Sequence, residues 1–380
     1  MKSTTLILGS LLALSSTLFA AEDVKVLETK TISFQPDYYL GWPTLLRQKD
    51  NRLIIVFSGG RQAHVCPFGR LEFITSQDDG QTWSFPRTIL DTDIDDRDAG
   101  ILETSKGTLL ATTFTSTAYE TYLNLAKEGK PAPYAKPETL PLWEAAHSRL
   151  THEQRQSLRG EWLVRSTDNG LTWSAPIRTL VDSPHGPAEL ADGRLLYVGR
   201  ELVSKPPRIG VSESNDDGLT WRWLSEIPVR AGDKAGLDYH ELHAVQANDG
   251  RIIAQIRHHG ETNHYETLQT ESEDGGKTWS EPRSIGVWGY PSHLLKLRDG
   301  TLLMTYGHRR APFGNQARIS RDHGRTWSSP LMISEDGQGQ DLGYPSSAEL
   351  ADGTLLTVWY ERLKGDKKTV LRQAHWKLNQ

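Results

Sequence analysis

The sequence predicts an all-β fold, a six-bladed β-propeller of four-stranded antiparallel blades with a helical insertion in blade 2. Three observations predict it. An eight-residue motif occurs five times, an apolar hairpin pattern occurs six times, and one insertion with helix-like stretches separates two copies of the motif. A unit that recurs roughly every 40–60 residues is typical of propellers and solenoids.

The apolar hairpins define six units. In each unit an apolar run meets Asp-Gly or a similar polar pair and turns into a second apolar run, as expected of two strands joined by a tight turn. The six hairpins occupy residues 45–57, 102–114, 188–199, 244–256, 294–306 and 348–360.

The motif S-x-D-x-G-x-T-W predicts the turn between the third and fourth strands of a unit. Its Asp accepts backbone N–H groups, its Gly adopts a positive φ, and its Trp offers a large apolar side chain to the neighbouring unit. We therefore assign the motif a structural and not a catalytic role. The copies lie at 76–83, 166–173, 214–221, 272–279 and 320–327.

Six units of four strands predict a closed radial ring. The sixth unit lacks the motif, so its last strand must come from elsewhere in the chain. Segment 24–34 alternates well enough to be that closing strand, and segment 369–378 is expected as its inner neighbour.

Residues 117–160 interrupt blade 2. Helix-like stretches at about 119–128 and 142–158 are separated by prolines. The hairpin pattern places this insertion in the loop between the second and third strands of the blade.

Composition limits the function classes. A net charge of −5 with 37% apolar residues is typical of a soluble globular protein, and no basic excess points to nucleic acid. Residues 1–20 have the layout of a secretory signal peptide, and their apolar run is too short to span a bilayer. We expect export to the periplasm or the extracellular space, no membrane insertion, and a single domain over residues 21–380. Cys66 is the only cysteine, which rules out an intramolecular disulfide.

Polar and aromatic residues recur where function is expected in a propeller. The segments that lead into the first strands and the loops between strands two and three share one face, at the mouth of the central channel. The leading segments contain Trp42, Arg97, Asp98, His185, His240, Glu241, His243, Tyr290, His293 and Tyr344. The loops add Arg61, His64, Arg200, Arg257, His258, His259, His308, Arg309, Arg310, Glu361 and Arg362. Several guanidinium groups around one cavity suit a carboxylate or sulfate on a sugar.

Over essentially the whole mature chain, these motifs resemble the sialidase superfamily. Sialidases use a Tyr nucleophile polarised by a Glu, an Asp acid/base, and three Arg that bind the sialic acid carboxylate. The resemblance of LGYPSSAELADG implies the nucleophile at Tyr344, and that of HELHAVQANDGRIIAQIR implies Glu241 and Arg257. The segment YGHRRAPFG implies the third arginine at Arg309 or Arg310.

Two elements of the family pattern are absent. The first arginine belongs in blade 1, where this sequence has GWPT with Trp42 in its place. The acid/base Asp belongs in the loop GGRQAHVCPFGR at 59–70, which contains no Asp, and His64 is the nearest titratable residue. These departures argue more strongly against sialic acid as the substrate than against enzyme activity.

Three functions remain open at this point. The leading hypothesis is an exported, exo-acting glycoside hydrolase that removes a terminal acidic sugar. A polysaccharide lyase that acts on uronates is the second, because Tyr, His and Arg also suit β-elimination, and a non-catalytic glycan-binding propeller is the third. The predicted catalytic residues are Tyr344, Glu241, His64 and His185. The predicted substrate-binding residues are Arg257, Arg309, Arg310, Arg61, Arg97, Asp98, Trp42, His240, His293 and Tyr290.

No metal site and no cofactor are predicted. HELH at 240–243 lacks the H-E-x-x-H spacing of zinc proteases. Segment 91–100 alternates acids like a calcium loop but lacks its Gly at position six and its Glu at position twelve. We interpret it as an acidic loop that holds Arg97, with calcium as the alternative. The expected partner is a glycan, while the sugar and the oligomeric state are left open.

Overall fold

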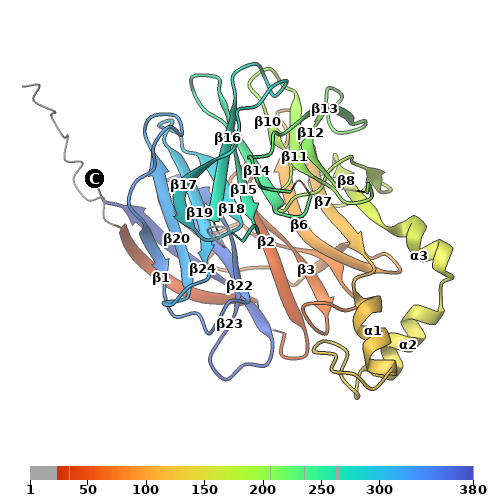
Figure 1. Cartoon of the computed structure of the whole chain (residues 1–380). Coiled ribbons are helices and arrows are strands. Elements are labelled where there is room, and N and C mark those ends of the chain that lie inside the picture. The colour runs from red at the N-terminus through yellow and green to blue at the C-terminus, as the bar shows by residue number, and fades with distance from the viewer. Residues whose placement is uncertain (1–23, 34, 206, 235, 262–265, 380) are drawn as a thin grey trace, which may run out of the picture.

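The predicted six-bladed propeller is confirmed. Figure 1 shows the computed structural model, which describes residues 24–33, 35–205, 207–234, 236–261 and 266–379. Six sheets of four antiparallel strands follow one another along the chain. The predicted signal peptide lies outside the described residues. No helix within those ranges has both the length and the apolar character needed to cross a bilayer.

The first three blades come from the N-terminal half of the chain. Blade 1 contains β2 (Tyr39–Arg47), β3 (Leu53–Arg61), β4 (Arg70–Ser76) and β5 (Arg87–Leu90). Blade 2 contains β6 (Asp95–Glu103), β7 (Leu109–Ser116), β8 (Gly160–Ser166) and β9 (Ile177–Arg178). Blade 3 contains β10 (Ala188–Glu189), β11 (Leu195–Glu201), β12 (Arg208–Ser214) and β13 (Arg222–Glu226).

The C-terminal half forms the other three blades. Blade 4 contains β14 (Tyr239–Gln246), β15 (Ile252–His258), β16 (Glu266–Ser272) and β17 (Arg283–Trp288). Blade 5 contains β18 (Ser292–Lys296), β19 (Leu302–His308), β20 (Gly314–Ser320) and β21 (Leu331–Ser334). Blade 6 contains β22 (Leu342–Glu349), β23 (Leu355–Arg362), β24 (Thr369–Leu378) and β1 (Val24–Ser33).

The ring closes as the sequence predicts. β1 is the outermost strand of blade 6 and runs antiparallel to β24, with Val24 opposite Leu378 and Ser33 opposite Leu371. The first and last strands therefore share one sheet, which joins the two ends of the described chain and leaves the ring without a gap.

The five eight-residue motifs are turns between third and fourth strands. In the last copy, Ser320 Oγ accepts the Gly324 N–H at 2.8 Å and donates to Asp322 Oδ1 at 2.7 Å. Thr326 then donates its N–H and its hydroxyl to the same carboxylate at 2.9 and 2.6 Å. Gly324 has φ 82°, and the equivalent glycines of the other four copies also have φ near 80–90°.

Apolar contacts between neighbouring blades form the core. Six buried clusters each join residues of two adjacent blades, one cluster at each of the six interfaces. The motif tryptophans extend these interfaces: Trp327 Nε1 of blade 5 donates to Gln269 Oε1 of blade 4 at 2.8 Å. The predicted packing of these side chains on a neighbouring unit is confirmed.

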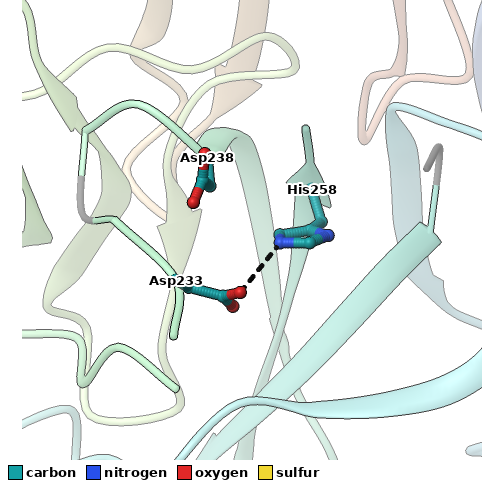
Figure 2. A group of neighbouring side chains, drawn as sticks. All are labelled: Asp233, Asp238 and His258. Atoms are coloured by element: carbon teal, nitrogen blue, oxygen red, sulfur yellow. Dashed lines mark ion pairs between the residues drawn. The ribbon is translucent and has the colours of Figure 1, made fainter. Parts of the chain in front are cut away.

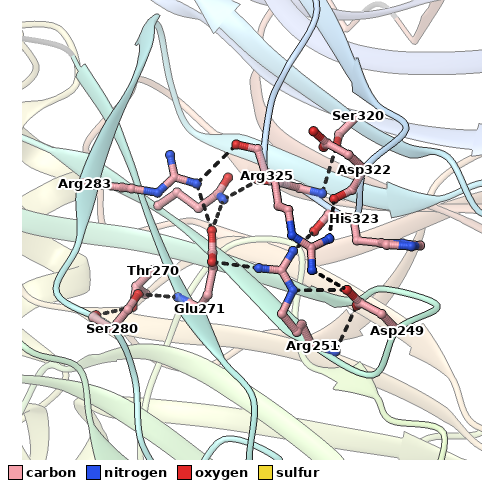
Figure 3. Close-up of polar contacts among 12 residues, drawn as sticks. Asp249, Arg251, Thr270, Glu271, Ser280, Arg283, Ser320, Asp322, His323 and Arg325 are labelled. Carbon is pink, nitrogen blue, oxygen red and sulfur yellow. Dashed lines mark hydrogen bonds and ion pairs between the residues drawn. The ribbon is translucent and has the colours of Figure 1, made fainter.

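Ion pairs lie at the same interfaces, at the ends of the strands opposite the channel mouth. Figure 3 shows the junction of blades 4 and 5, where Arg251 contacts Glu271 at 2.9 Å and also donates to the backbone carbonyl of His323. Arg325 of blade 5 reaches back to Asp249 of blade 4 at 3.3 Å. These charges pair with one another near the turns of the face opposite the channel mouth.

The insertion lies between β7 and β8, as predicted, and contains three helices beside the ring (Figure 1): α1 (Tyr119–Lys127), α2 (Leu140–Ser148) and α3 (His152–Leu158). The prediction of one helical stretch at about 142–158 was wrong, because residues 149–151 separate α2 from α3. Thr151 starts α3 with a capping box, because its side chain accepts the Gln154 N–H while Gln154 accepts the Thr151 N–H. The helices enclose a small core with Cys66 and Trp143.

Candidate active site

Most inner strands are distorted where they reach the mouth. One non-glycine residue in each of five blades has a left-handed backbone, and in β2, β6, β14 and β22 a register shift accompanies it. A bulge redirects a side chain, and left-handed backbone at such residues costs about 1–3 kcal/mol, which favours a functional reason. The residues and their φ values are Trp42 (54°), Asp98 (49°), His185 (74°), Glu241 (30°) and Tyr344 (50°).

A cavity of about 200 Å³ opens at the same face. Its lining comes from every blade except the third, and it includes eight of the fourteen predicted site residues together with two that were not predicted, Phe114 and Tyr360. The lining residues are Trp42, His64, Arg97, Asp98, Phe114, Glu241, Arg257, Arg309, Tyr344 and Tyr360.

Tyr344, Glu241 and Arg257 are in direct contact in this cavity. The Tyr344 hydroxyl donates to Glu241 Oε1 at 2.6 Å, and Arg257 Nη1 donates to Glu241 Oε2 at 2.6 Å and to the Tyr344 oxygen at 3.0 Å. Burial opposes ionisation of Glu241, but Arg257 outweighs it and lowers the pKa to about 2. Burial and the Glu241 charge raise the pKa of Tyr344 well above its usual value. The resting site therefore holds a neutral phenol beside a carboxylate and a guanidinium.

Arg309 presents a charge that the protein does not neutralise. Its guanidinium carbon lies 5.7 Å from the centre of the Tyr344 ring and 5.2 Å from that of Tyr290. Its Nε and Nη2 atoms are buried and have no hydrogen-bond partner among the described residues. Buried guanidinium groups are normally paired, so this side chain is suited to bind an anion that enters the cavity.

Asp98 is the other carboxyl group of the cavity. It is 6% exposed and accepts no hydrogen bond from any described residue. Burial and the nearby Glu241 charge raise its pKa to about 7, against the opposing effect of Arg97 and Arg257. Asp98 therefore holds its proton to a higher pH than an ordinary carboxyl group does.

His64 is positioned by a residue that the sequence analysis did not identify. Its Nδ1 lies 3.2 Å from Asp341 Oδ1 and 2.8 Å from the Tyr39 hydroxyl, which itself donates to Asp341 at 2.8 Å. Nδ1 therefore carries the proton, and Nε2 keeps its lone pair. Burial lowers the pKa of His64, so it is neutral and accepts protons. Asp341 comes directly before LGYP, and an Asp likewise starts the leading segments at Asp182 and Asp238, which was the available signal.

The structure places Arg61 behind the cavity. It is fully buried, and its two terminal nitrogens donate to Asp95 at 2.6 and 3.0 Å. Its guanidinium carbon lies 4.8 Å from the centre of the Trp42 ring, and that of Arg97 lies 4.6 Å from the same ring. Two arginines therefore lie against Trp42, and only Arg97 also lines the cavity.

We expect Arg61→Met to act on stability. The substitution leaves Asp95 buried with only the longer 3.3 Å contact to Arg97, so the free energy of unfolding should fall by about 3 kcal/mol in urea titrations. Arg61→Met combined with Asp95→Asn should recover part of the loss. A stable Arg61→Met protein with a raised KM would instead indicate substrate binding.

His185, His243 and His293 lie in the channel, outside the lining of the cavity. Their rings are 4.9–5.4 Å apart, all three are buried, and burial lowers the pKa of each, that of His243 to about 3. Two predicted site residues, His185 and His293, thus lie beside each other and not in the cavity with Tyr344.

These histidines predict acid sensitivity. Each is neutral when folded but accepts a proton near pH 6.5 when unfolded, so its contribution to stability is complete above pH 6.5 and is lost as the pH falls below it. For His243→Gln, the plot of unfolding free energy against pH should become flatter by about 1.4 kcal/mol per pH unit below pH 6. An unchanged slope in urea titrations at several pH values would contradict this expectation.

The comparisons with known proteins agree with the fold. Residues 109–357 match the model of the BNR repeat-like domain. The chain belongs to this family. The BNR-repeat protein is 24% identical to a sialidase of Bacteroides fragilis (strain YCH46) over 225 residues, which are 52% of this chain and 39% of the relative. It therefore spans well under half the length of that curated relative.

Two solved structures show the same fold. A Dyadobacter fermentans protein of unknown function superposes on the BNR-repeat protein with a TM-score of 0.75 at 22% identity, over 94% of this chain and 99% of that one. The NanB sialidase of Streptococcus pneumoniae has a TM-score of 0.64 at 14% identity, over 93% and 70%. The resemblance to the sialidase superfamily is thus confirmed.

The three other predicted residues surround the cavity of the BNR-repeat protein without lining it. The Tyr290 ring lies under Arg257, 4.0 Å from its guanidinium carbon. The Arg310 guanidinium lies against Trp288 at 5.4 Å, which leaves Arg309 as the arginine of the pair that faces the cavity. His240 contacts Arg200 of blade 3 at 3.1 Å.

One group of three described side chains has the spacing of a metal site: Asp233, Asp238 and His258 (Figure 2). His258 Nε2 lies 3.3 Å from Asp233, but Arg230 Nε also donates to Asp233 at 2.8 Å. A guanidinium already supplies the positive charge there, so we assign no metal.

Two acids of segment 91–100 are also occupied by protein groups. Asp95 pairs with Arg61 and Arg97, and Asp96 accepts the N–H and hydroxyl of Thr92, both at 2.8 Å. The loop therefore holds Arg97 as expected. Calcium at this loop stays an untested alternative.

Proposed function

We propose that this protein is an exo-acting glycoside hydrolase that removes a terminal sugar carrying a carboxylate from a glycan. The 2.6 Å hydrogen bond from Tyr344 to Glu241 is the observation that supports it most. A tyrosine nucleophile needs a carboxylate in contact to take its proton. A non-catalytic propeller has no need of that contact, which removes the main ground for the third hypothesis.

The proposed reaction has two steps. The Tyr344 oxygen attacks the anomeric carbon and gives its proton to Glu241 while the glycosidic C–O bond breaks and Asp98 protonates the departing oxygen. Asp98 then takes a proton from water, whose oxygen attacks the same carbon. Tyr344 leaves with the proton held by Glu241, and the anomeric configuration is retained. A neutral nucleophile suits an anionic sugar, because a carboxylate nucleophile would repel it.

The arginines support an acidic sugar as the substrate. Arg257 and Arg309 lie on neighbouring blades at the cavity, and two buried nitrogens of Arg309 find no partner in the described part of the chain. A carboxylate between them would supply those partners by charge-assisted hydrogen bonds. The layout of residues 1–20 adds the expectation that the enzyme acts after export.

A specific observation favours the second candidate, a lyase. His64 Nε2 carries a lone pair, has no partner among the described residues, and belongs to a ring fixed by Asp341. Such a group suits removal of the C5 proton of a uronate while Asp98 protonates the leaving oxygen.

One assay separates the candidates. Purified protein without residues 1–20 is incubated with 4-methylumbelliferyl sialosides, 4-methylumbelliferyl glucuronides and acidic polysaccharides. Released fluorophore with a saturated sugar product supports the hydrolase. Near-ultraviolet absorbance of an unsaturated uronate, without hydrolysis, would support the lyase and overturn the first proposal.

A further inference from the structure

A second cavity adjoins the catalytic one. It has a volume of about 430 Å³ and lies between the start of the insertion and the end of β11 in blade 3. Phe114 lines both cavities. Blade 3 contributes nothing to the lining of the catalytic cavity, so this space is the blade 3 sector of the same mouth. The two cavities therefore meet at Phe114.

Arg200, in the wall of this second cavity, lacks an acidic partner. Its Nη1 donates to His240 Nδ1 at 3.1 Å, while His240 Nε2 donates to the Leu237 carbonyl at 2.8 Å. This tautomer makes His240 a neutral acceptor. Arg200 Nε is buried without a hydrogen-bond partner, and Arg200 makes no ion pair within the described part of the chain. Burial lowers the pKa of Arg200, with only the nearby Glu241 charge opposing it. The protein therefore positions this guanidinium without neutralising it.

The other charged groups of the cavity leave a net positive charge. Among the described residues, the Arg159 guanidinium has one hydrogen-bond partner, the neutral side-chain oxygen of Gln156 at 3.0 Å. Glu120 is the one acidic residue in the lining, and it is paired with Arg155 at 2.6 Å. Two arginines thus face a space whose only carboxylate is already occupied.

We propose that Arg200 and Arg159 form a second anion subsite, which binds a carboxylate or sulfate on the sugar next to the one held by Arg257 and Arg309. This inference rests on the proposed hydrolase and narrows its substrate class. The substrate is a glycan with negative charges on at least two consecutive sugars, and its second sugar passes Phe114.

Binding is tested first, without catalysis. Crystals are soaked in selenate, whose anomalous scattering locates bound anions, for the wild type, Arg200→Gln and the matched control Arg208→Gln. Arg208 lies on the outer part of blade 3, paired with Glu226 at 2.8 Å. We expect one selenate at Arg257–Arg309 and one at Arg200–Arg159, the second lost only in Arg200→Gln. A wild-type crystal without selenate at Arg200 would overturn the proposal.

Kinetics test the same subsite. The sugar found in the activity assay is used as its 4-nitrophenyl and its 3-carboxy-4-nitrophenyl glycoside. Arg200→Gln should lower the ratio of kcat/KM for the carboxylated over the neutral glycoside by about 10- to 100-fold, and Arg208→Gln should leave the ratio unchanged. An unchanged ratio in Arg200→Gln overturns the subsite. If no sugar is cleaved, the proposed function fails while the selenate result still decides the subsite.

Discussion

Replacing Tyr344 by Phe should lower kcat/KM by about 10⁴-fold or more, because a ring without the oxygen cannot form the covalent intermediate. The substitution removes one hydroxyl and leaves Glu241 in contact with Arg257 at 2.6 Å. The fold should therefore survive, with a circular dichroism spectrum and Tm close to those of the wild type. A fluorinated analogue of the substrate should add its glycosyl mass to the peptide that contains Tyr344.

Tyr306→Phe is the matched control for this loss. Tyr306 is equally buried and donates to Gln316 at 2.8 Å, but it does not line the cavity. Its variant should lose some stability and keep its activity. If Tyr344→Phe retains more than a tenth of the wild-type kcat/KM, or if the mass label appears on another peptide, Tyr344 is not the nucleophile.

Replacing Asp98 by Asn should lower kcat/KM by about 10²- to 10⁴-fold for substrates with a sugar leaving group, because the proton donor is lost. An aryl leaving group departs without protonation, so cleavage of a 4-nitrophenyl glycoside should fall far less in the first step. The pKa of about 7 at Asp98 also predicts that the wild-type kcat/KM declines above pH 7, as the acid form disappears. That alkaline decline should be absent in Asp98→Asn.

His64→Gln tests whether His64, and not Asp98, exchanges the proton with the leaving oxygen. His64 occupies the blade 1 loop in which the family pattern has its Asp, so it competes with Asp98 for this role. The result to compare is a kcat/KM that stays high for the aryl glycoside and no longer declines above pH 7. If His64→Gln, and not Asp98→Asn, gives this result, His64 is the group that protonates the leaving oxygen. Equal losses on both leaving groups in Asp98→Asn would assign Asp98 to substrate binding.

The fold followed from the sequence because its signals are local. Each hairpin turn and each eight-residue turn is specified by residues at most seven positions apart, such as Ser320 and Trp327, and repetition of the unit then requires a ring. The insertion was located for the same reason. The break between its second and third helices at Thr151 was missed, since a four-residue capping box is a weaker signal than the apolar pattern around it.

The sequence predicted the candidate site only in part. Tyr344, Glu241, Arg257 and Arg309 are close in space because equivalent positions of a propeller converge on one axis, which register alone predicts. Asp341 was missed, because its role depends on a contact with His64 across 277 positions of the sequence. Arg61 and His185 belong to the predicted segments, but their side chains meet Asp95 and the other channel histidines instead of the cavity.

By itself, the sequence determined the architecture, the face on which function is expected and the types of residue gathered there, since turn chemistry and strand register are short-range properties. Only the tertiary structure decided which charges are neutralised. Arg61 and Arg309 look alike in the sequence, yet one is paired with a buried carboxylate and the other keeps two buried nitrogens without partners. Pairing and burial depend on distances between blades, so they decide which arginine is left to bind a substrate.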